Sequence, residues 1–176
     1  MKNYTIKLQE GVTLQISGGN RKMMAGFGIF NLVEGITCPG STPKCRECCY
    51  AAKASRIYPS VLPRRKANLE ASKHPLFVPA MIDAIGKLEK TKEFRQFFRI
   101  HEAGDFYCQD YVDAWGRIAV KFPEVKFLAF TKSFFLDFSC LPGNVQIVYS
   151  IMEDTSAEAL AKVPQGGIKA YAGNCA

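Results

Sequence analysis

Four cysteines lie within a segment of twelve residues, a density that packing alone does not explain: Cys38, Cys45, Cys48 and Cys49. Pro39, Gly40 and Pro43 stand between the first two thiols, where they stop regular helix and strand and favour a turning loop. Such a loop can direct several sulfurs at one centre. The segment therefore predicts a metal or iron–sulfur site.

Cysteine thiolates grouped in one loop, with a fourth ligand from elsewhere, are typical of iron–sulfur clusters. Three ligands of a 4Fe–4S cluster are expected from this loop: Cys38, Cys45 and either Cys48 or Cys49. Only one of the adjacent pair is expected to bind, because the side chains of neighbouring residues diverge. If only three bind, one iron stays open to a substrate or cofactor. If Cys175 folds back as the fourth ligand, the cluster is closed and suited to a structural or electron-transfer role.

Zinc is the alternative metal for the same loop. A four-thiolate zinc site is usually built from two Cys-x2-4-Cys pairs, and only Cys45 with Cys48 or Cys49 has that spacing. The spacing favours iron–sulfur over zinc. Cys108 and Cys140 stand alone and are interpreted as ordinary buried thiols.

A second group of reactive side chains follows a predicted strand, at His101, Glu102 and Asp105. These residues are candidates for proton transfer or for hydrogen bonds to a ligand. The structural alternative is that Asp105 caps the following segment and His101 is satisfied in the core. Thr131 and Lys132, after the next predicted strand, are candidates for binding a carboxylate or phosphate of a cofactor, or are simply turn residues.

The chain of 176 residues carries a formal charge of +7, and much of the excess is local. The segment from Lys44 to Lys73 holds eight basic residues against Glu47 and Glu70. A basic surface of this kind attracts nucleic acid or another polyanion. The alternative, at even weight, is a solvated positive face without a partner.

The composition, 48% hydrophobic with 12% aromatic residues, is that of a globular protein. No run approaches the roughly 20 apolar residues that span a bilayer, and the first ten residues contain no apolar segment of a secretory signal. We therefore expect a cytoplasmic protein with no membrane partner and with reduced thiols.

Hydrophobic periodicity predicts the elements that position these side chains. Strands are expected at 4–8 and 12–16 as a hairpin, then at 27–32, 94–101, 125–130, 145–150 and 168–172. Helices are expected at 51–56, 63–72, 75–88, 110–122 and 155–163, the last capped by Thr155 or Asp154.

This order predicts an α/β protein with a mostly parallel sheet flanked by helices, either open or a partial (β/α) barrel. We expect a single domain over 1–176: an N-terminal β segment (1–36) with a hairpin, a cysteine loop (37–56) and an α/β body (57–176). Functional groups gather at the carboxyl ends of parallel strands. The cysteine loop and the 101–105 and 131–132 segments should therefore share one edge.

The sequence also resembles a known family over roughly residues 26–135. The shared elements are the Cys38–Cys45 run ending in Cys49-Tyr50-Ala51, and then Tyr58-Pro59, Arg65, Asn68, Arg99-Ile100-His101, Gly104-Asp105-Phe106, Tyr111, Trp115 and 127–132. They are similar to the phage "gene product 88" family, whose members occur in bacteriophages and mobile elements. A second phage family with a similar cysteine element is grouped near radical S-adenosylmethionine (SAM) proteins.

The resemblance implies that Cys38, Cys45 and Cys49 are the cluster ligands and that Cys48 is their neighbour. Three hypotheses follow. The first is a 4Fe–4S protein with a reduced radical-SAM-like α/β fold, whose open iron binds SAM beneath the 101–105 strand end. The second is a binding module in which a cluster or zinc shapes a basic surface for nucleic acid or a host protein. The third is an electron-transfer protein with a closed four-cysteine cluster.

Overall fold

A seven-stranded mixed sheet organises the computed structural model, which describes residues 3–19 and 26–172. The sheet begins with an antiparallel hairpin, β1 (Asn3–Lys7) and β2 (Thr13–Ser17), joined through the short 3-10 helix η1 (Gln9–Gly11). Leu14 and Ile16 of β2 point into the core, while the alternate residues of β2 face the other way. The predicted hairpin is confirmed.

The remaining strands run parallel to one another and neighbour each other in chain order: β3 (Gly28–Phe30), β4 (Phe97–Ile100), β5 (Lys126–Thr131), β6 (Val145–Ile151) and β7 (Ile168–Tyr171). β2 joins this part of the sheet antiparallel to β3. The strand order runs from β1 to β7 without closing into a ring. The predicted fold class is therefore confirmed in its open form.

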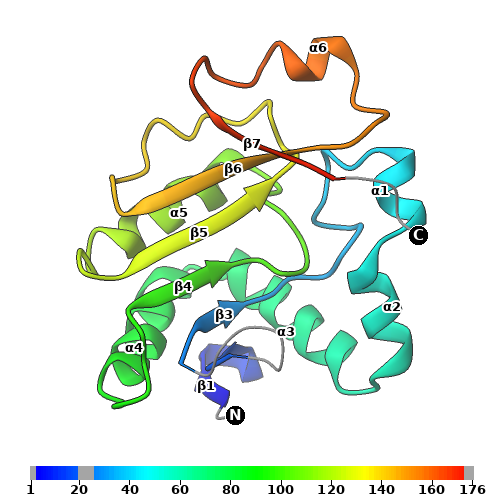
Figure 1. The fold of residues 1–176 in the computed structure, drawn as a ribbon. Helices are drawn as coiled ribbons and strands as arrows, with labels where there is room; N and C mark the ends of the chain where they lie inside the picture. The colour runs from blue at the N-terminus through cyan, green and yellow to red at the C-terminus, as the bar shows by residue number, and fades with distance from the viewer. Residues whose placement is uncertain (1–2, 20–25, 173–176) are drawn as a thin grey trace.

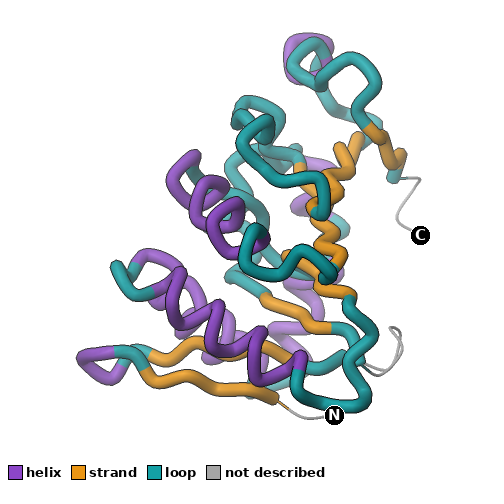
Figure 2. The backbone as a smooth tube through the Cα atoms, turned by 90° about the vertical axis from the view of Figure 1, so that its left-hand side faces the viewer, coloured by secondary structure: helices purple, strands orange, loops and turns teal. Residues whose placement is uncertain are grey.

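Helices α4 (Phe77–Glu89) and α5 (Gln109–Ala119) cover one face of the sheet (Figure 2). Trp115 of α5 is fully buried and packs edge-on against Phe30, with Phe98 and Phe127 also around it. Burying an aromatic side chain of this size contributes roughly 1.5–3 kcal/mol. The residues that alternate with Phe98 and Phe127, such as Arg99 and Leu128, are only half-buried because this face of the sheet is less covered.

The cysteine segment and the helices that follow it stand at the carboxyl ends of the parallel strands (Figure 1). These helices are α1 (Pro43–Glu47), α2 (Tyr50–Ile57) and α3 (Val61–Lys73). The buried amide of Asn68 fastens α3 to the sheet between β2 and β3. It exchanges hydrogen bonds with the Gln15 backbone at 2.7 and 2.9 Å and donates to the Asn31 carbonyl at 2.9 Å.

Three local predictions were wrong. Pro43 begins helix α1 instead of prolonging a turning loop, because its fixed φ suits the first helical position. β4 begins only at Phe97, so the predicted strand was too long at its start. Helix α6 spans only Ala157–Leu160 and is capped by Ser156, whereas Asp154 bonds Lys44 and Thr155 bonds Met152.

No helix within the described parts of the chain is both long and apolar enough to cross a membrane.

Candidate functional site

Cys38 is held in a turn that follows β3. The Thr37 hydroxyl donates to the Val33 carbonyl at 2.7 Å, and the Cys38 backbone N–H donates to the Gly35 carbonyl at 3.1 Å. The Cys38 carbonyl then accepts from the Ser41 N–H at 3.0 Å. These local bonds fix the direction in which the chain leaves β3.

The other cysteines are spread over two short helices. Thr42 caps α1 by accepting from the Cys45 N–H at 3.2 Å. Cys48 ends α1 and Cys49 is the N-cap of α2, so the chain changes direction between these two residues. The Cys48 sulfur lies 3.1 Å from the Lys44 carbonyl oxygen. Cys48 is disulfide-bonded, so the expectation of reduced thiols was wrong at this residue, and of the two adjacent cysteines Cys49 is the one that lines the pocket described next.

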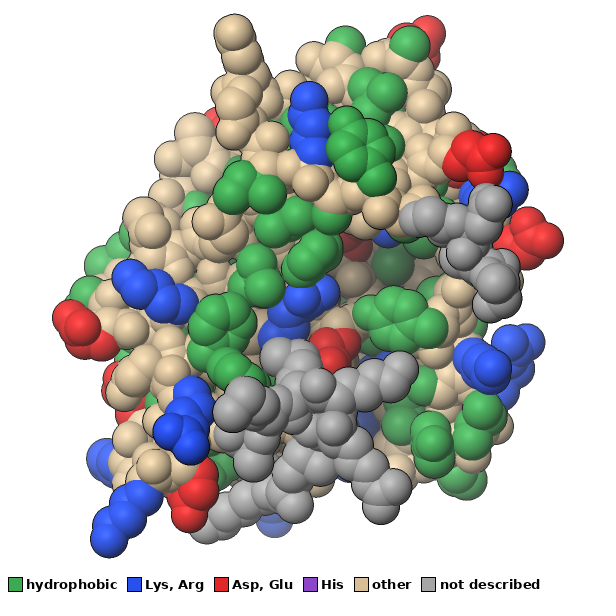
Figure 3. All heavy atoms as spheres, in the orientation of Figure 1, with side chains coloured by type: hydrophobic (Ala, Val, Ile, Leu, Met, Phe, Trp, Pro, Cys, Tyr) green, Lys and Arg blue, Asp and Glu red, His purple; other side chains and the backbone are tan. Residues whose placement is uncertain are grey.

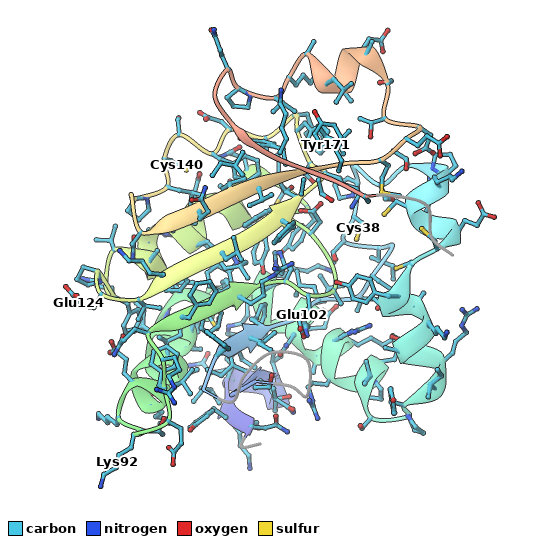
Figure 4. All side chains as sticks on the ribbon, in the orientation of Figure 1. Cys38, Lys92, Glu102, Glu124, Cys140 and Tyr171 are labelled. Atoms are coloured by element: carbon cyan, nitrogen blue, oxygen red, sulfur yellow. The ribbon has the colours of Figure 1, made fainter. Side chains whose placement is uncertain are left out.

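A pocket of about 220 Å³, which we call the cysteine pocket, receives three of these side chains: Cys38, Cys45 and Cys49. All three are half-buried free thiols. Glu102, Asp105 and Lys132 line the same pocket. Cys38 and Glu102 lie at the carboxyl end of the strands, and Cys140 lies toward the opposite end (Figure 4). The cysteine loop therefore lies at the same edge of the sheet as the residues that follow β4 and β5, where the sequence predicted it.

The three thiols interact electrostatically in this pocket. Burial, then the Asp105 carboxylate and then the neighbouring Cys45 and Cys49 raise the pKa of Cys38 to about 11. Thiolates placed here would repel one another and Asp105. A cationic centre that all three sulfurs could share would offset this repulsion.

Among the described residues, no three His, Cys, Asp or Glu side chains come together closely enough to hold a single metal ion. The ligands of an iron–sulfur cluster lie farther apart than those of a single metal ion, because each cysteine binds a different iron atom. Cys175, the predicted fourth ligand, lies outside the described residues. Cys108 is half-buried, but Cys140 is exposed, so the expectation of a buried thiol was wrong there.

Two glycines allow the cysteine loop to approach the strand ends. A Cβ on Gly40 would stand 2.0 Å from the carbonyl oxygen of Lys132. Gly104 has φ of +85° and lies against Leu32 and Thr37. Both positions require a residue without a side chain, and Gly104 also requires left-handed backbone.

Asp105 is a buried junction between β4 and β5. Its carboxylate accepts from the Phe106 N–H, the Thr131 hydroxyl and the Lys132 N–H, each at 2.7 Å. Burial raises the pKa of Asp105 to about 6, although these bonds act in the opposite direction. Asp105 therefore positions the Thr131–Lys132 corner beside Cys38, and the Thr131 hydroxyl is already engaged there.

His101 directly follows β4 in the left-handed region, with φ of +63°. Its side chain is buried, with Nε2 2.8 Å from the Tyr111 hydroxyl and the ring against Phe106. Burial and the nearby Arg99 lower the pKa of His101 to about 3, so the ring is neutral near pH 7. A proton-transfer role for His101 remains a prediction: the residue is among those that line the cysteine pocket, and its Nε2 is engaged with the Tyr111 hydroxyl.

The pocket also holds two cationic side chains, of which Arg99 was not predicted as a site residue. Its guanidinium lies over the Phe130 ring at 4.1 Å and donates through Nε to the His101 carbonyl at 2.8 Å. Lys132 Nζ donates to the Ser150 hydroxyl at 3.2 Å. The signal for Arg99 was its place between the apolar Phe98 and Ile100, where strand alternation puts it on the less covered face.

A buried ion pair stabilises the position of α2, the helix whose N-cap is Cys49. Arg65 Nη1 lies 2.7 Å from Glu34 Oε2 and donates to the Ala51 carbonyl and the Ser55 hydroxyl, each at 2.9 Å. The Tyr50 hydroxyl donates to the Glu102 carbonyl. α2 is thereby tied to the chain after β3, to α3 and to the end of β4.

The structure pairs several cations of the Lys44–Lys73 segment with acids. Lys44 pairs with Glu153, Arg65 with Glu34 and Lys73 with Glu70. The exposed cations that remain, among them Lys53, Arg56 and Lys66, are spread over α2 and α3. The continuous basic stretch in the sequence thus becomes a more dispersed charge in the fold.

The fold and the pocket define an open α/β protein with three thiols beside charged side chains at the carboxyl edge of its sheet. A family model, Gene product 88, matches residues 3–174, and the chain belongs to that family. The resemblance to it is therefore confirmed over a longer stretch than the motifs covered.

Two phage proteins are similar to this chain. The Gene 88 protein of Mycobacterium phage D29 is 29% identical over 182 aligned positions, covering 84% of this chain and 74% of the phage protein. The Gene 88 protein of Mycobacterium phage L5 is 32% identical over 126 positions, covering 65% of this chain and 51% of the phage protein. The chain thus spans about half the length of the phage L5 protein. No solved structure matches, and the comparisons lend no support to a likeness to radical SAM proteins.

Proposed function

We propose that this phage-family chain is an iron–sulfur protein whose cluster is bound by the thiolates of Cys38, Cys45 and Cys49. The observation that carries the proposal is the convergence of these three free thiols on one pocket at the carboxyl edge of the sheet. Cysteine thiolates are the donors that iron–sulfur clusters use. The donor set in the pocket therefore fits a 4Fe–4S cluster.

Three cysteines leave one iron of such a cluster open, and the proposal extends to SAM as its ligand. A cluster of this kind supplies single-electron chemistry to a ligand bound at the open iron. Arg99 and Lys132 supply positive charge in the same pocket for a carboxylate such as that of SAM. Asp105 holds the Lys132 backbone in place.

The test is anaerobic purification followed by iron, sulfide and zinc analysis and a visible spectrum. We expect a brown protein with about four irons and four sulfides per chain. Cys38→Ser should lose the iron, and Cys140→Ser, on the exposed thiol at the opposite end of the sheet, should keep it. A colourless protein with one zinc per chain would contradict the proposal, as would a Cys38→Ser variant that keeps its cluster.

Binding of SAM to the open iron can be tested separately. Added SAM should change the electron paramagnetic resonance spectrum of the reduced cluster in the wild-type chain. An unchanged spectrum would reject an open iron that binds SAM. Loss of the cluster in Cys175→Ala would instead indicate a closed, four-cysteine electron-transfer site.

The second candidate is a nucleic-acid-binding protein in which the metal site only stabilises the fold. It is favoured by the exposed cations Lys53, Arg56 and Lys66 near the cysteine segment. Binding through these residues should weaken steeply as salt rises. Binding that does not respond to salt, or to the triple substitution of these residues by Gln, would reject this candidate.

A further inference from the structure

A second pocket of about 450 Å³ lies between the sheet and α3, next to the cysteine pocket. We call it the arginine pocket, after Arg64, and Gln15, Ser17, Asn31 and Glu102 are among the residues that line it. Glu102 also lines the cysteine pocket, so the two pockets meet at this residue. A volume of this size is within the range of small-molecule binding sites.

Most of the residues that line the arginine pocket are polar. Gln15 and Ser17 stand on the less covered face of β2, opposite the buried Leu14 and Ile16. Within the described residues, the side chains of Asn3, Gln15 and Ser17 make no hydrogen bond to the protein. Their amides and hydroxyl are therefore available to a ligand that both donates and accepts hydrogen bonds.

Arg64 is the cation of this pocket that has no acidic partner among the described residues, and Glu102 supplies a carboxylate at the edge shared with the cysteine pocket. Arg64 is half-buried in α3, and no ion pair or hydrogen bond to its guanidinium is found among the residues that the structure describes. The adjacent Arg65 is neutralised by Glu34 at 2.7 Å. A partly buried guanidinium without a counter-ion favours an anionic ligand, and its planar fork suits a phosphate or carboxylate.

We infer that the arginine pocket binds a small, polar, anionic molecule, with Arg64 on its phosphate or carboxylate group. Its uncharged part lies along Gln15, Ser17 and Asn31, toward Glu102. Figure 3 shows the hollow of the neighbouring cysteine pocket, with basic and acidic side chains inside it. A role for this molecule as the substrate of a cluster in the cysteine pocket would rest on the proposed function. Its binding in the arginine pocket does not.

The test measures binding of three anionic probes to the full chain by calorimetry: inorganic phosphate, citrate and AMP, with adenosine as the uncharged control. We expect at least one anion to bind and to raise the melting temperature. Adenosine should bind more weakly than AMP if AMP is the anion that binds. Arg64→Gln should weaken the binding about tenfold or more, the range of a charge-assisted hydrogen bond.

Lys73→Gln is the matched control, because it removes one positive charge from an exposed position on the same helix, outside the arginine pocket. It should leave the binding within about twofold of wild type, since an exposed charge adds little. Equal binding to wild type and Arg64→Gln would overturn the inference, and so would failure of all three anions to bind.

The same titrations on Cys38→Ser separate this inference from the proposed function. The arginine pocket contains no cysteine, so anion binding should persist in this variant. If the wild-type chain holds no iron after anaerobic purification but still binds an anion, the cluster is refuted and the anion site is kept. A chain that holds the cluster but binds none of the three anions would support the proposed function and reject the anion site.

Discussion

The backbone N–H of Lys44 donates a hydrogen bond to the Asp154 carboxylate at 2.8 Å, although 110 positions separate the two residues in the chain. Hydrogen bonds from Thr42 and the Lys44 N–H lower the pKa of Asp154 and so favour the charged carboxylate. The helix that carries Cys45 is thereby docked onto the loop after β6. The cysteine pocket depends on contacts from the far end of the chain.

Asp154→Ala should loosen this docking and lower the iron content of anaerobically purified protein. Glu153→Ala is the control, because its pair with the Lys44 ammonium is exposed on both sides and such pairs contribute little. Iron analysis of both variants makes the comparison. Equal iron in the two would show that the bond to Asp154 does not position Cys45.

The two adjacent cysteines should behave differently when each is replaced. Cys49 lines the cysteine pocket, whereas the Cys48 sulfur lies against the Lys44 carbonyl. We expect Cys49→Ser to lose the cluster absorbance and Cys48→Ser to keep most of it. A cluster that survives Cys49→Ser but not Cys48→Ser would reverse this assignment of the ligand.

Gly40→Ala should displace the cysteine loop from the end of β5. The new Cβ would meet the Lys132 carbonyl, a backbone atom that cannot move aside easily, so we expect a loss of about 1–3 kcal/mol in the free energy of unfolding. Gly143→Ala, where a Cβ would meet open space, is the control. Urea unfolding of the iron-free proteins measures both; matching midpoints would refute the close approach.

Arg65→Ala should destabilise the protein by about 3–5 kcal/mol, because it leaves Glu34 as a buried charge without its partner. Arg65→Lys restores the charge but not the bonds to Ala51 and Ser55, so it should recover only part of the loss. Urea unfolding provides the measurement. A cost for Arg65→Ala below about 1 kcal/mol would mean that the pair is solvated in solution.

Acid should destabilise the iron-free protein through His101. Its pKa is lowered to about 3 in the folded chain, against about 6.5 when unfolded. The unfolded state therefore binds more protons between these values, and stability is present above about pH 6.5 and is lost as the pH falls toward 3.

His101→Asn, which tolerates the left-handed backbone at this position, should remove this part of the pH dependence. His74→Asn, on the other histidine of the chain, should retain it. Unfolding curves at several pH values test the prediction. The same slope in wild type and His101→Asn would assign the acid sensitivity to another group.

The sequence predicted much of the fold because its signals are local. Alternation in β2 and β5 and the apolar stripe of α5 follow from which side chains face a core. Consecutive strands tend to be neighbours in a sheet, and this order holds here even across the helices that separate β3 from β4 in the chain. α6 was predicted less well because Asp154, its expected cap, bonds Lys44 instead. β4 starts later than predicted, directly after Gln96, whose φ of +56° is outside the strand region.

For the candidate site, the sequence by itself determined the density of thiols and the acidic strand end that faces them. Only the tertiary structure decided which thiols share a pocket, that Asp105 braces two strands and that His101 turns toward Tyr111. It also brought Arg64 beside Gln15, 49 positions earlier in the chain. The physical reason is that residue types and spacing set local conformation, whereas proximity between distant segments is set by how the sheet and its helices pack.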